Sequence, residues 1–277
     1  MEDTVITSSQ NQYVSMVRGL SDRKNREKHR IYRVDGIKLL CEAIGRGAEI
    51  DLVVFCEGQD LFVRSKAKAL YGIDIYGNAF HAVTVAKSIF DRLSEENAPE
   101  GVISVIRYDG QRHRELEGAE IDVGGHERIM ILEAVRDPQN VGAIMRAAAA
   151  FSVDRIIMSR DCADIYNPKT VRASMGALFS LRVDRVVSVR DAILSLGKKG
   201  RRVFAAALDE GAQRLGELNI QDGDCVVIGN EGHGLSAETI SACALSVYIP
   251  MSDGVESLNA ATAAAVIAWE FFGKNTR

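Results

Sequence analysis

The stretch Ile249-Pro-Met-Ser-Asp-Gly-Val-Glu-Ser-Leu-Asn-Ala-Ala-Thr-Ala-Ala-Ala-Val-Ile-Ala-Trp-Glu270 decides how the C-terminal half of the chain is interpreted. It predicts a strand ending at Ile249, a polar loop, and a helix that begins near Ser257. The Ser257 hydroxyl can accept from an unpaired N–H of the first turn, where Asn259 lies beside the positive end of the helix dipole. Such a loop between a strand end and a capped helix can form a small-ligand pocket. An ordinary strand–loop–helix unit that packs well is the alternative.

Length and composition indicate a globular protein large enough for two domains. The chain has 277 residues, of which 47% are hydrophobic and 26% charged, as in folded proteins without long disordered tracts. The apolar run 260–272 is too short to span a bilayer and contains Thr262 and Glu270. The N-terminal residues lack the basic and apolar regions of a signal peptide, so we expect a cytoplasmic protein with no membrane partner.

The cysteines and histidines predict neither disulfides nor a metal. The five cysteines are an odd number, are widely spaced and form no Cys-x-x-Cys pair. We expect buried, reduced thiols, as is usual in a cytosolic protein. No His/Cys cluster has the spacing of metal ligands, so no metal is predicted.

One segment is basic although the chain as a whole is acidic. A net charge of −4 argues against a protein that coats nucleic acid, but the segment Arg18–Lys38 can neutralise RNA phosphates locally. The alternative is a solvated helix face on which Glu27 pairs with a basic neighbour. The predicted RNA-binding residues are Arg23, Lys24, Arg26, Lys28, Arg30 and Arg33.

The pattern of apolar residues predicts two α/β domains joined by a linker. Residues 1–108 combine strand signals at 52–55, 73–76 and 101–106 with helical patterns at 37–44, 61–71 and 86–93, which indicates a partly parallel sheet. Residues 109–127 are polar and rich in glycine, as linkers are. In residues 128–277 the alternation restarts, with strands expected at 129–132, 155–158, 181–187, 203–207, 225–228 and 245–249. An open sheet of this kind binds its ligand beyond the carboxyl ends of its strands.

Two further loops follow strands of the second domain. In the segment Leu132–Phe151, Asn140 is placed to cap the next helix, and Arg146 is a charged residue among small ones. In the segment Val227–Ser236, three glycines around Asn230 and Glu231 let backbone approach a ligand. The glycine spacing differs from that of the dinucleotide fingerprint, so an NAD site is not predicted.

Taken together, these loops resemble the signature motifs of the SpoU/TrmH branch of the SPOUT RNA methyltransferases. The family element Asp-Pro-x-Asn-x-Gly-x-Ile-x-Arg is matched by Asp137–Arg146, and Gly-x-Glu-Gly-x-Gly is matched by Gly229–Gly234. Ile-Pro-Met and Ser-Leu-Asn are matched by Ile249–Met251 and Ser257–Asn259. Ala173–Leu178 is similar to the family's Ala-Ser-x-Gly-Ala segment. The first 108 residues are more loosely similar to the family's small substrate-binding domain, through Tyr32–Gly36.

The resemblance implies a fold and an activity. The fold would be a SPOUT-type open α/β sheet with a deep C-terminal trefoil knot, preceded by a smaller α/β domain that binds the substrate. The chain would be a homodimer with each site near the subunit interface. It would methylate a ribose 2′-hydroxyl of structured RNA, with S-adenosylmethionine as the methyl donor and no metal.

The resemblance also assigns roles to residues. Arg146 would bind the substrate phosphate or the developing alkoxide and act on the 2′-hydroxyl, although an arginine is a poor free base near neutral pH. Asn140 and Glu231 would position Arg146 or the ribose, and Ser257 and Asn259 would order the loop. The residues expected to hold the cofactor are Ala207, Gly229, Ile249, Met251 and Leu258.

Two alternatives remain open within this interpretation. Ribosomal RNA is favoured over transfer RNA by the additional N-terminal domain. A non-catalytic RNA-binding member of the fold is the alternative of a different class, and the intact motif residues argue against it. The chain departs from the family pattern at Glu133, where Asp is common, and at Arg182, where Pro often follows Ser-Leu.

Overall fold

The computed structural model describes residues 5–75, 80–118, 120–230, 232–252, 254 and 257–274. They form two compact units, and we describe each unit by itself. The first comprises Met1–Asp109 and Tyr166–Phe179, and the second comprises Gly110–Ile165 and Ser180–Arg277. The sequence did not indicate that the short segment Tyr166–Phe179 would group with the N-terminal unit.

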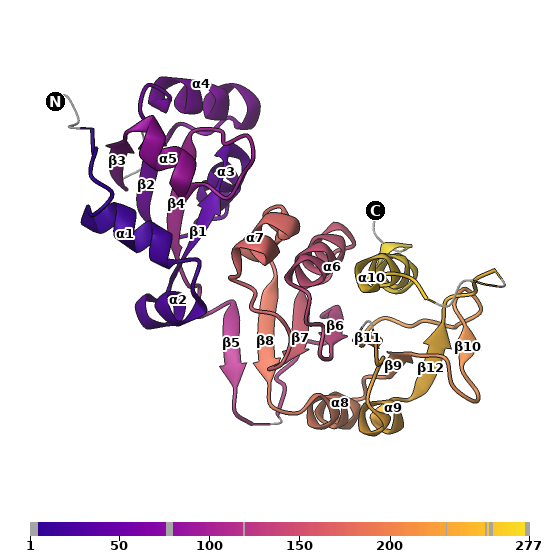
Figure 1. The fold of residues 1–277 in the computed structure, drawn as a ribbon. Coiled ribbons are helices and arrows are strands. Elements are labelled where there is room, and N and C mark those ends of the chain that lie inside the picture. The colour runs from indigo at the N-terminus through magenta and orange to yellow at the C-terminus, as the bar shows by residue number, and fades with distance from the viewer. Residues whose placement is uncertain are drawn as a thin grey trace. The chain divides into compact units, whose positions relative to one another are not determined.

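The first unit is a four-stranded sheet covered by helices on both faces (Figure 1). Its strand order is β1-β4-β2-β3, with β4 antiparallel to both neighbours and β2 parallel to β3, so the expectation of a partly parallel sheet is confirmed. Its elements are α1 (Gln12–Gly19), α2 (Arg23–His29), β1 (Ile31–Asp35), α3 (Ile37–Gly45), β2 (Ile50–Cys56), α4 (Asp60–Tyr71), β3 (His81–Val85), α5 (Lys87–Leu93), β4 (Val102–Arg107), α7 (Pro168–Ser174) and the short turn η2 (Ala177–Phe179).

Strand β2 shows why this sheet has two cores. Leu52, Val54 and Cys56 pack in a cluster with residues of α1 and α5, whereas Val53 and Phe55 pack in a second cluster with residues of α3 and α4. Successive side chains of a strand point to opposite faces. A strand that is apolar at every position must therefore be covered on both sides, and the sequence of β2 predicts the sandwich of helices that is observed.

One predicted strand of this unit is wrong and two strands were not foreseen. Residues 73–75 are not a strand, and Ile75 is buried in the core beside α3 and α4. The strand lies instead at β3, after residues 76–79, which are outside the described part of the chain. Strand β1 was read only as part of a motif, although its residues pair along their whole length with β4.

The second unit is built on an eight-stranded sheet in the order β10-β12-β9-β11-β6-β7-β8-β5. Every pairing between its described strands is parallel. In Figure 1, α6 and α10 lie on one side of this sheet, and α8 and α9 lie on the other. Its elements are β5 (His113–Leu116), β6 (Ile129–Leu132), α6 (Pro138–Ala150), β7 (Arg155–Ser159), β8 (Arg182–Val186), α8 (Val189–Lys198), β9 (Val203–Ala206), β10 (Gln213–Arg214), β11 (Cys225–Ile228), α9 (Ala237–Ala242), β12 (Leu245–Tyr248), α10 (Ala260–Ala268) and the turn η3 (Trp269–Gly273).

The α/β class and the parallel sheet are confirmed, and all six strands predicted for this domain are present within two residues of their predicted ends. Two strands were missed. Strand β10 has only two residues, and β5 lies inside the segment 109–127 that was interpreted as a linker. Because β5 pairs with β8 along four residues, part of that segment belongs to the sheet. The trefoil knot stays a prediction.

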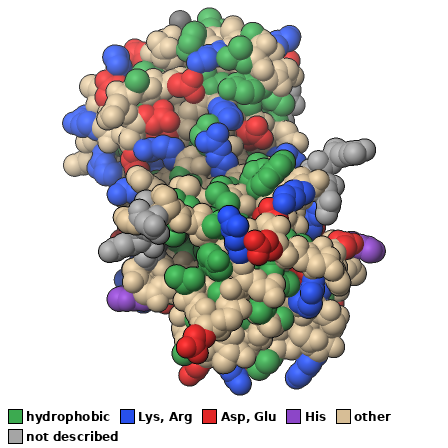
Figure 2. Space-filling view, turned by 90° about the vertical axis from the view of Figure 1, so that its right-hand side faces the viewer, with side chains coloured by type: hydrophobic (Ala, Val, Ile, Leu, Met, Phe, Trp, Pro, Cys, Tyr) green, Lys and Arg blue, Asp and Glu red, His purple; other side chains and the backbone are tan. Residues whose placement is uncertain are grey.

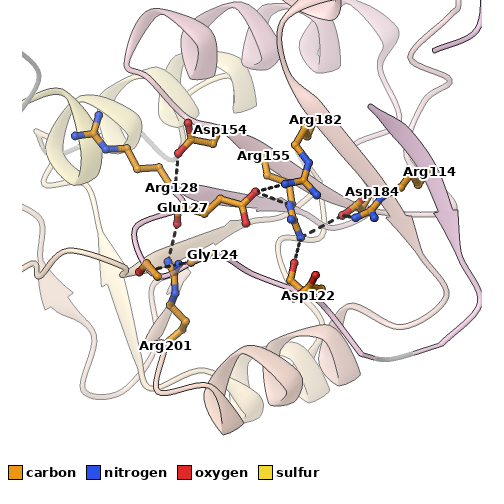
Figure 3. Close-up of polar contacts among 11 residues, drawn as sticks. Arg114, Asp122, Gly124, Glu127, Arg128, Asp154, Arg155, Arg182, Asp184 and Arg201 are labelled. Atoms are coloured by element: carbon orange, nitrogen blue, oxygen red, sulfur yellow. Dashed lines mark hydrogen bonds and ion pairs between the residues drawn. The ribbon is translucent and has the colours of Figure 1, made fainter. Parts of the chain in front are cut away.

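A network of buried charges lies at the amino end of this sheet, where several strands begin (Figure 3). The Arg155 side chain is 1% exposed, and its guanidinium contacts Glu127 at 2.9 Å and Asp184 at 3.3 Å. Asp184 is fully buried and accepts two further 2.8 Å hydrogen bonds from Arg114. Buried charges are tolerated only when they are paired and hydrogen-bonded, and each of these groups meets that requirement.

Arg155 and a second arginine fix the segment that leads into β6. Arg155 donates to the main-chain oxygen of Asp122 at 2.8 Å, and Arg201 donates to the main-chain oxygens of Gly124, Glu127 and Gly223. Neither arginine belongs to the segment that it fixes. The last part of the predicted linker is therefore held to the sheet by a side chain of β7 and by Arg201, two residues before β9.

The expectation of free thiols is confirmed: all five cysteines are free, and only Cys243 is more than marginally exposed. Burial raises the pKa of the Cys225 and Cys243 thiols to about 12, so neither is an activated nucleophile. Among the described helices, none has the length and apolar composition needed to cross a membrane.

Replacing Asp184 with Asn should strongly destabilise the second unit. The change removes the charge that compensates Arg155 and Arg114, and breaking a buried pair in this way costs about 3–5 kcal/mol. The readout is urea unfolding followed by the fluorescence of Trp269, the chain's one tryptophan. Asp191→Asn is the matched control, because Asp191 is about half exposed and pairs with Arg190 at 3.1 Å, an arrangement worth at most about 1 kcal/mol. Equal losses in the two variants would contradict a structural role for the network.

Candidate functional site

Three loops meet at the carboxyl edge of the larger sheet because the strands before them are neighbours. Strand β9 lies between β12 and β11, with Val247 paired to Ala206 and Val227 paired to Ala205. In parallel strands the carboxyl ends lie at one edge. The residues that follow, Ile249, Ala207 and Gly229, therefore lie along the same edge, and all three belong to the predicted cofactor set.

Gly229 occupies a place that no other residue could take without moving the backbone. A Cβ atom there would lie 2.5 Å from the carbonyl carbon and oxygen of Gly234 and 2.7 Å from the nitrogen of Leu235. The contact arises because Asn230 and Gly234 exchange two 3.0 Å main-chain hydrogen bonds and close the loop on itself. The glycine-rich loop is thus a tight ring beside Gly229. Glu231, which was predicted to be catalytic, lies outside the described residues.

Asn230 fastens this ring to the loop after β6. Its Nδ2 donates to the Ala134 oxygen at 2.8 Å, and its Oδ1 accepts from the nitrogens of Gly232 and His233. From the sequence, Asn230 was predicted only to lie among the glycines of this loop. The residue type alone could have indicated this role, because Asn side chains commonly hydrogen-bond to the backbone two residues further along the chain.

Asn259 and Asn140 join two of the motif loops directly. Asn259 Nδ2 donates to Asn140 Oδ1 at 3.0 Å. Asn259 Oδ1 accepts from the nitrogens of Ala261 at 2.9 Å and Thr262 at 3.3 Å, so the same amide caps α10. Two residues 119 positions apart in the sequence are held together at the starts of α6 and α10.

Both predicted helix caps were placed wrongly. The N-cap of α10 is Asn259, and Ser257 lies exposed in the loop two residues before it. The N-cap of α6 is Asp137, which accepts from the nitrogens of Gln139 and Asn140, and Pro138 occupies the first helical position. The reason is the same in each case, since Asp and Asn are as good N-caps as Ser and helix ends are the least certain part of a pattern. Asn140 is thereby left to bond Asn259.

Arg146 is exposed on α6 and does not join Asn140 on one helix face. It follows Asn140 by six residues, which corresponds to about 240° around an α-helix. Within the described part of the chain it makes no hydrogen bond or ion pair. The structure therefore brings together Asn140, Asn259 and the Gly229 loop, whereas it leaves the Arg146 guanidinium available at the surface.

The basic segment is divided between surface and interior. Arg26 is 1% exposed and donates to the oxygens of Leu20 and Ser21 at 2.8 Å. Arg33 is 3% exposed and binds both oxygens of Asp35. These two arginines stabilise the fold and cannot reach an RNA phosphate, so they are removed from the predicted RNA-binding set.

Four of the six predicted residues remain exposed: Arg23, Lys24, Lys28 and Arg30. The pairing that the alternative anticipated is present, with Arg23 and Glu27 in contact at 2.7 Å. The face drawn in Figure 2, the right-hand side of Figure 1, shows Lys and Arg side chains interspersed with Asp and Glu side chains. In the basic segment, Arg23 pairs with Glu27, and Arg26 and Arg33 are buried, so an RNA contact there must come from a few local cations.

The predicted cofactor loop has the chemistry of a main-chain site. The main-chain groups of Met251 and Leu258 have no hydrogen-bond partner among the described residues, and the side chains of Ile249 and Leu258 are half-buried and apolar. Free N–H and C=O groups next to apolar side chains suit a flat, polar-edged ring such as adenine. A purine-bearing cofactor fits these residues. Among the described residues, no cluster of His, Cys, Asp and Glu could hold a metal ion.

Two family models match the chain, one in each unit. The model of the SpoU rRNA Methylase family matches residues 127–269, and the model of the MRM3-like substrate binding domain matches residues 11–104. The first covers more than half of the chain and contains all three motif loops.

Relatives and solved structures agree with these matches. A 23S rRNA (guanosine(2553)-2′-O)-methyltransferase of Bacillus subtilis is 26% identical over 97% of this chain and 99% of its own length. An AdoMet-bound rRNA methyltransferase from Sinorhizobium meliloti has a TM-score of 0.81 and 25% identity, with 99% of each chain covered. A SpoU methyltransferase from Streptomyces viridochromogenes in complex with AdoMet has a TM-score of 0.80 and 25% identity, with 96% of this chain and 98% of that chain covered.

Gly229→Ala should destabilise the second unit, whereas Gly232→Ala should not. A Cβ at Gly229 meets backbone at 2.5 Å, and such overpacking costs about 1–3 kcal/mol. A Cβ at Gly232 meets only the Asn230 side chain, at 3.6 Å, so its effect should stay within about 0.5 kcal/mol. Urea unfolding followed by Trp269 fluorescence measures both. Equal stability of the two variants would show that the ring can open without cost.

Proposed function

The chain belongs to the SpoU rRNA methylase family, and we propose that it transfers a methyl group from S-adenosylmethionine to a ribose 2′-hydroxyl of ribosomal RNA. The observation that carries the proposal is the junction of Asn140 and Asn259 at the same sheet edge as the closed Gly229 loop. A structure that only bound RNA would have no need of this closed loop and bonded amide pair. The sizes and folds of the rRNA-methylating relatives support ribosomal RNA as the substrate.

The residues of the carboxyl edge would hold the cofactor. Gly229, Ile249 and Leu258 supply main-chain groups and apolar surface for its adenine and ribose, and Ala207 and Met251 complete the same edge. When bound, the sulfonium of S-adenosylmethionine supplies a methyl group that needs little help to leave. The protein must then mainly hold the acceptor oxygen in line, and orientation of this kind can supply about 7–11 kcal/mol of the barrier.

Arg146 is the residue that acts on the acceptor. Its guanidinium has five donors in a rigid fork that fits a phosphate or a developing alkoxide. Stabilising the alkoxide makes the 2′-hydroxyl easier to deprotonate without requiring arginine to be a free base. Asn140 and Asn259 keep the starts of α6 and α10 in register, so that the acceptor and the donor meet at a fixed distance.

The chain acts as a homodimer, and the orientation of Arg146 supports this proposal. Arg146 points away from the Asn140 face of its own helix, so it can serve a site formed by a second copy. The helix beside it, α10, continues into apolar side chains that are well exposed, with Val266 at 39% and Trp269 at 51%. In Figure 1, α6 and α10 lie side by side, as a shared dimer face requires. Burying this surface against a second copy would remove it from water.

The remaining parts of the proposal follow from the family. The segment from β12 to α10 passes through a trefoil knot in which the cofactor binds. Residues 1–108 bind the RNA, with 109–127 leading to the catalytic domain, and the exposed cations Arg23, Lys24, Lys28 and Arg30 contact its phosphates. The bacterial rRNA-methylating relatives support a cytoplasmic location.

Arg146→Ala should lower kcat for methylation of rRNA by about 10²–10⁴-fold and leave the affinity for S-adenosylmethionine unchanged, because Arg146 is absent from the cofactor edge. Transfer of labelled methyl groups and calorimetry provide the two readouts. Lys198→Ala, another exposed cation on a helix of the same unit, is the control and should behave as the wild type. Near-normal transfer by Arg146→Ala would refute the catalytic role.

The exposed basic residues should determine how strongly RNA binding depends on salt. Changing Arg23, Lys24, Lys28 and Arg30 together to Ala should reduce the slope of log K against log salt concentration by roughly 3, since each contact on single-stranded or duplex RNA contributes about 0.7–0.9. The control changes Lys87 and Arg92, which are exposed on α5 of the same unit. A slope that falls equally in both variants, or in neither, would remove this surface from the proposal.

A further inference from the structure

A cavity of about 550 Å³ lies at the carboxyl edge of the larger sheet, next to the candidate site. All of its lining residues belong to the second unit. They come from the loops that follow β6, β7, β8 and β11 and from the starts of α8 and α9. The volume is within the usual range of small-molecule sites, about 300–1,000 Å³, and none of the proposed cofactor residues lines it.

Two of its walls are the same loops that form the methyl-transfer site. Asn230 lines the cavity and also follows Gly229 directly. Arg136 lines it and precedes Asp137, the residue that caps α6 and thereby places Asn140. A group bound in the cavity would therefore be held by the backbone that orders the acceptor and the donor.

The polar groups of the cavity include both a strong donor and a strong acceptor. Arg136 and Asp161 are 3.4 Å apart, and their side chains are 68% and 51% exposed. So long a contact leaves most of the guanidinium donors available. Asp161 Oδ1 also accepts from Ser159 Oγ at 2.6 Å, so each oxygen of this carboxylate has one partner and keeps a further acceptor position for a ligand. Glu133 is not available in the same way, because its two oxygens already accept three hydrogen bonds from Ser236 and Thr239.

An apolar surface completes the cavity. Val187 lines it and is 58% exposed, which places it among the most exposed large hydrophobic side chains of the described residues. An apolar side chain can pack against the face of a base. Sequence-specific recognition of RNA relies on unstacked bases that are hydrogen-bonded along their edges.

We propose that this cavity binds an unstacked guanine base of the substrate RNA, with Arg136 donating to O6 and N7 and Asp161 accepting from N1–H and the N2 amino group. Guanine is the base that offers two acceptors on one edge, which arginine binds in a bidentate manner, together with donors on the adjoining edge. The inference rests on the proposed function, because it supplies that reaction with a determinant of sequence specificity.

A phosphate group fits the cavity less well than a base. Asp161 and Glu238 both line it, and each carboxylate repels an anion. Arg190 lines it as well, but its guanidinium is paired with Asp191 at 3.1 Å. Arg136 lies 3.4 Å from Asp161, so the cavity presents a donor beside an acceptor. The charges on these walls therefore favour a neutral ring that carries both kinds of hydrogen-bonding group.

The test uses mononucleotides as probes and needs no methyl transfer. In saturation-transfer difference NMR, the guanine H8 proton of GMP should show transfer from the protein, and IMP, which lacks the N2 amino group, and AMP should show at least about fivefold less. Arg136→Ala and Asp161→Asn should each reduce the GMP signal by about fivefold or more. Arg160→Ala is the matched control, because Arg160 is 41% exposed and does not line the cavity, and it should leave the signal unchanged.

Three outcomes would overturn the inference. One is equal transfer to GMP and AMP, another is displacement of GMP by inorganic phosphate, and the third is a GMP signal that survives in Asp161→Asn and Arg136→Ala. The separate readout is methylation of deproteinised rRNA, in which Arg136→Ala should raise KM for the RNA about tenfold and leave KM for S-adenosylmethionine unchanged. Methylation without GMP binding would remove this inference alone, whereas absence of methylation with GMP binding intact would remove only the proposed function.

Discussion

The hydrogen bond from Asn259 to Asn140 is the interaction on which the candidate site depends. It connects the starts of two helices that follow different strands, and the same Asn259 side chain caps the helix that it begins. The Asn259 amide therefore has two roles that cannot be separated. A hydrophobic residue at position 259 would leave unpaired N–H groups at the start of α10 and would also release one helix from the other, whereas a hydrophobic residue at position 140 would break the bond between the helices.

The parallel sheet divides the second unit into an edge for stability and an edge for chemistry. At the amino edge, buried arginines such as Arg155 and Arg201 are fully engaged by carboxylates and main-chain oxygens. Arg136, at the carboxyl edge, and Arg146, on α6, are exposed, and their side chains have few or no partners among the described residues. Arginines that are buried and paired thus stabilise the fold, whereas exposed arginines remain available for a ligand. This division is what a sheet of parallel strands permits, because every loop that follows a strand lies at one edge.

Much of the fold could be predicted because the strands of the larger sheet are short, continuous apolar runs such as Ile129–Leu132. Strand β10 could not, since its two polar residues Gln213 and Arg214 pair only through their backbone. Strand β5 was hidden in a polar segment because it lies at the sheet edge, where one side has no neighbour. The members of the candidate site were found through their motifs. The role of each side chain in the site could not be predicted without coordinates. A shift of two residues in the start of α10 decides whether Asn259 or Ser257 caps it. The rotation of α2 about its axis decides whether Arg26 or Lys28 is buried.

A double-mutant cycle on methyl transfer tests the central claim most directly. Single-turnover rates of methylation of rRNA would be measured for the wild type, Asn140→Ala, Asn259→Ala and the double variant, at saturating S-adenosylmethionine. If the amide pair acts as a unit, the double variant should be slowed little more than the slower single variant, because either change already breaks the bond. Rate losses that multiply in the double variant would contradict the account, since they would show that the two asparagines act independently.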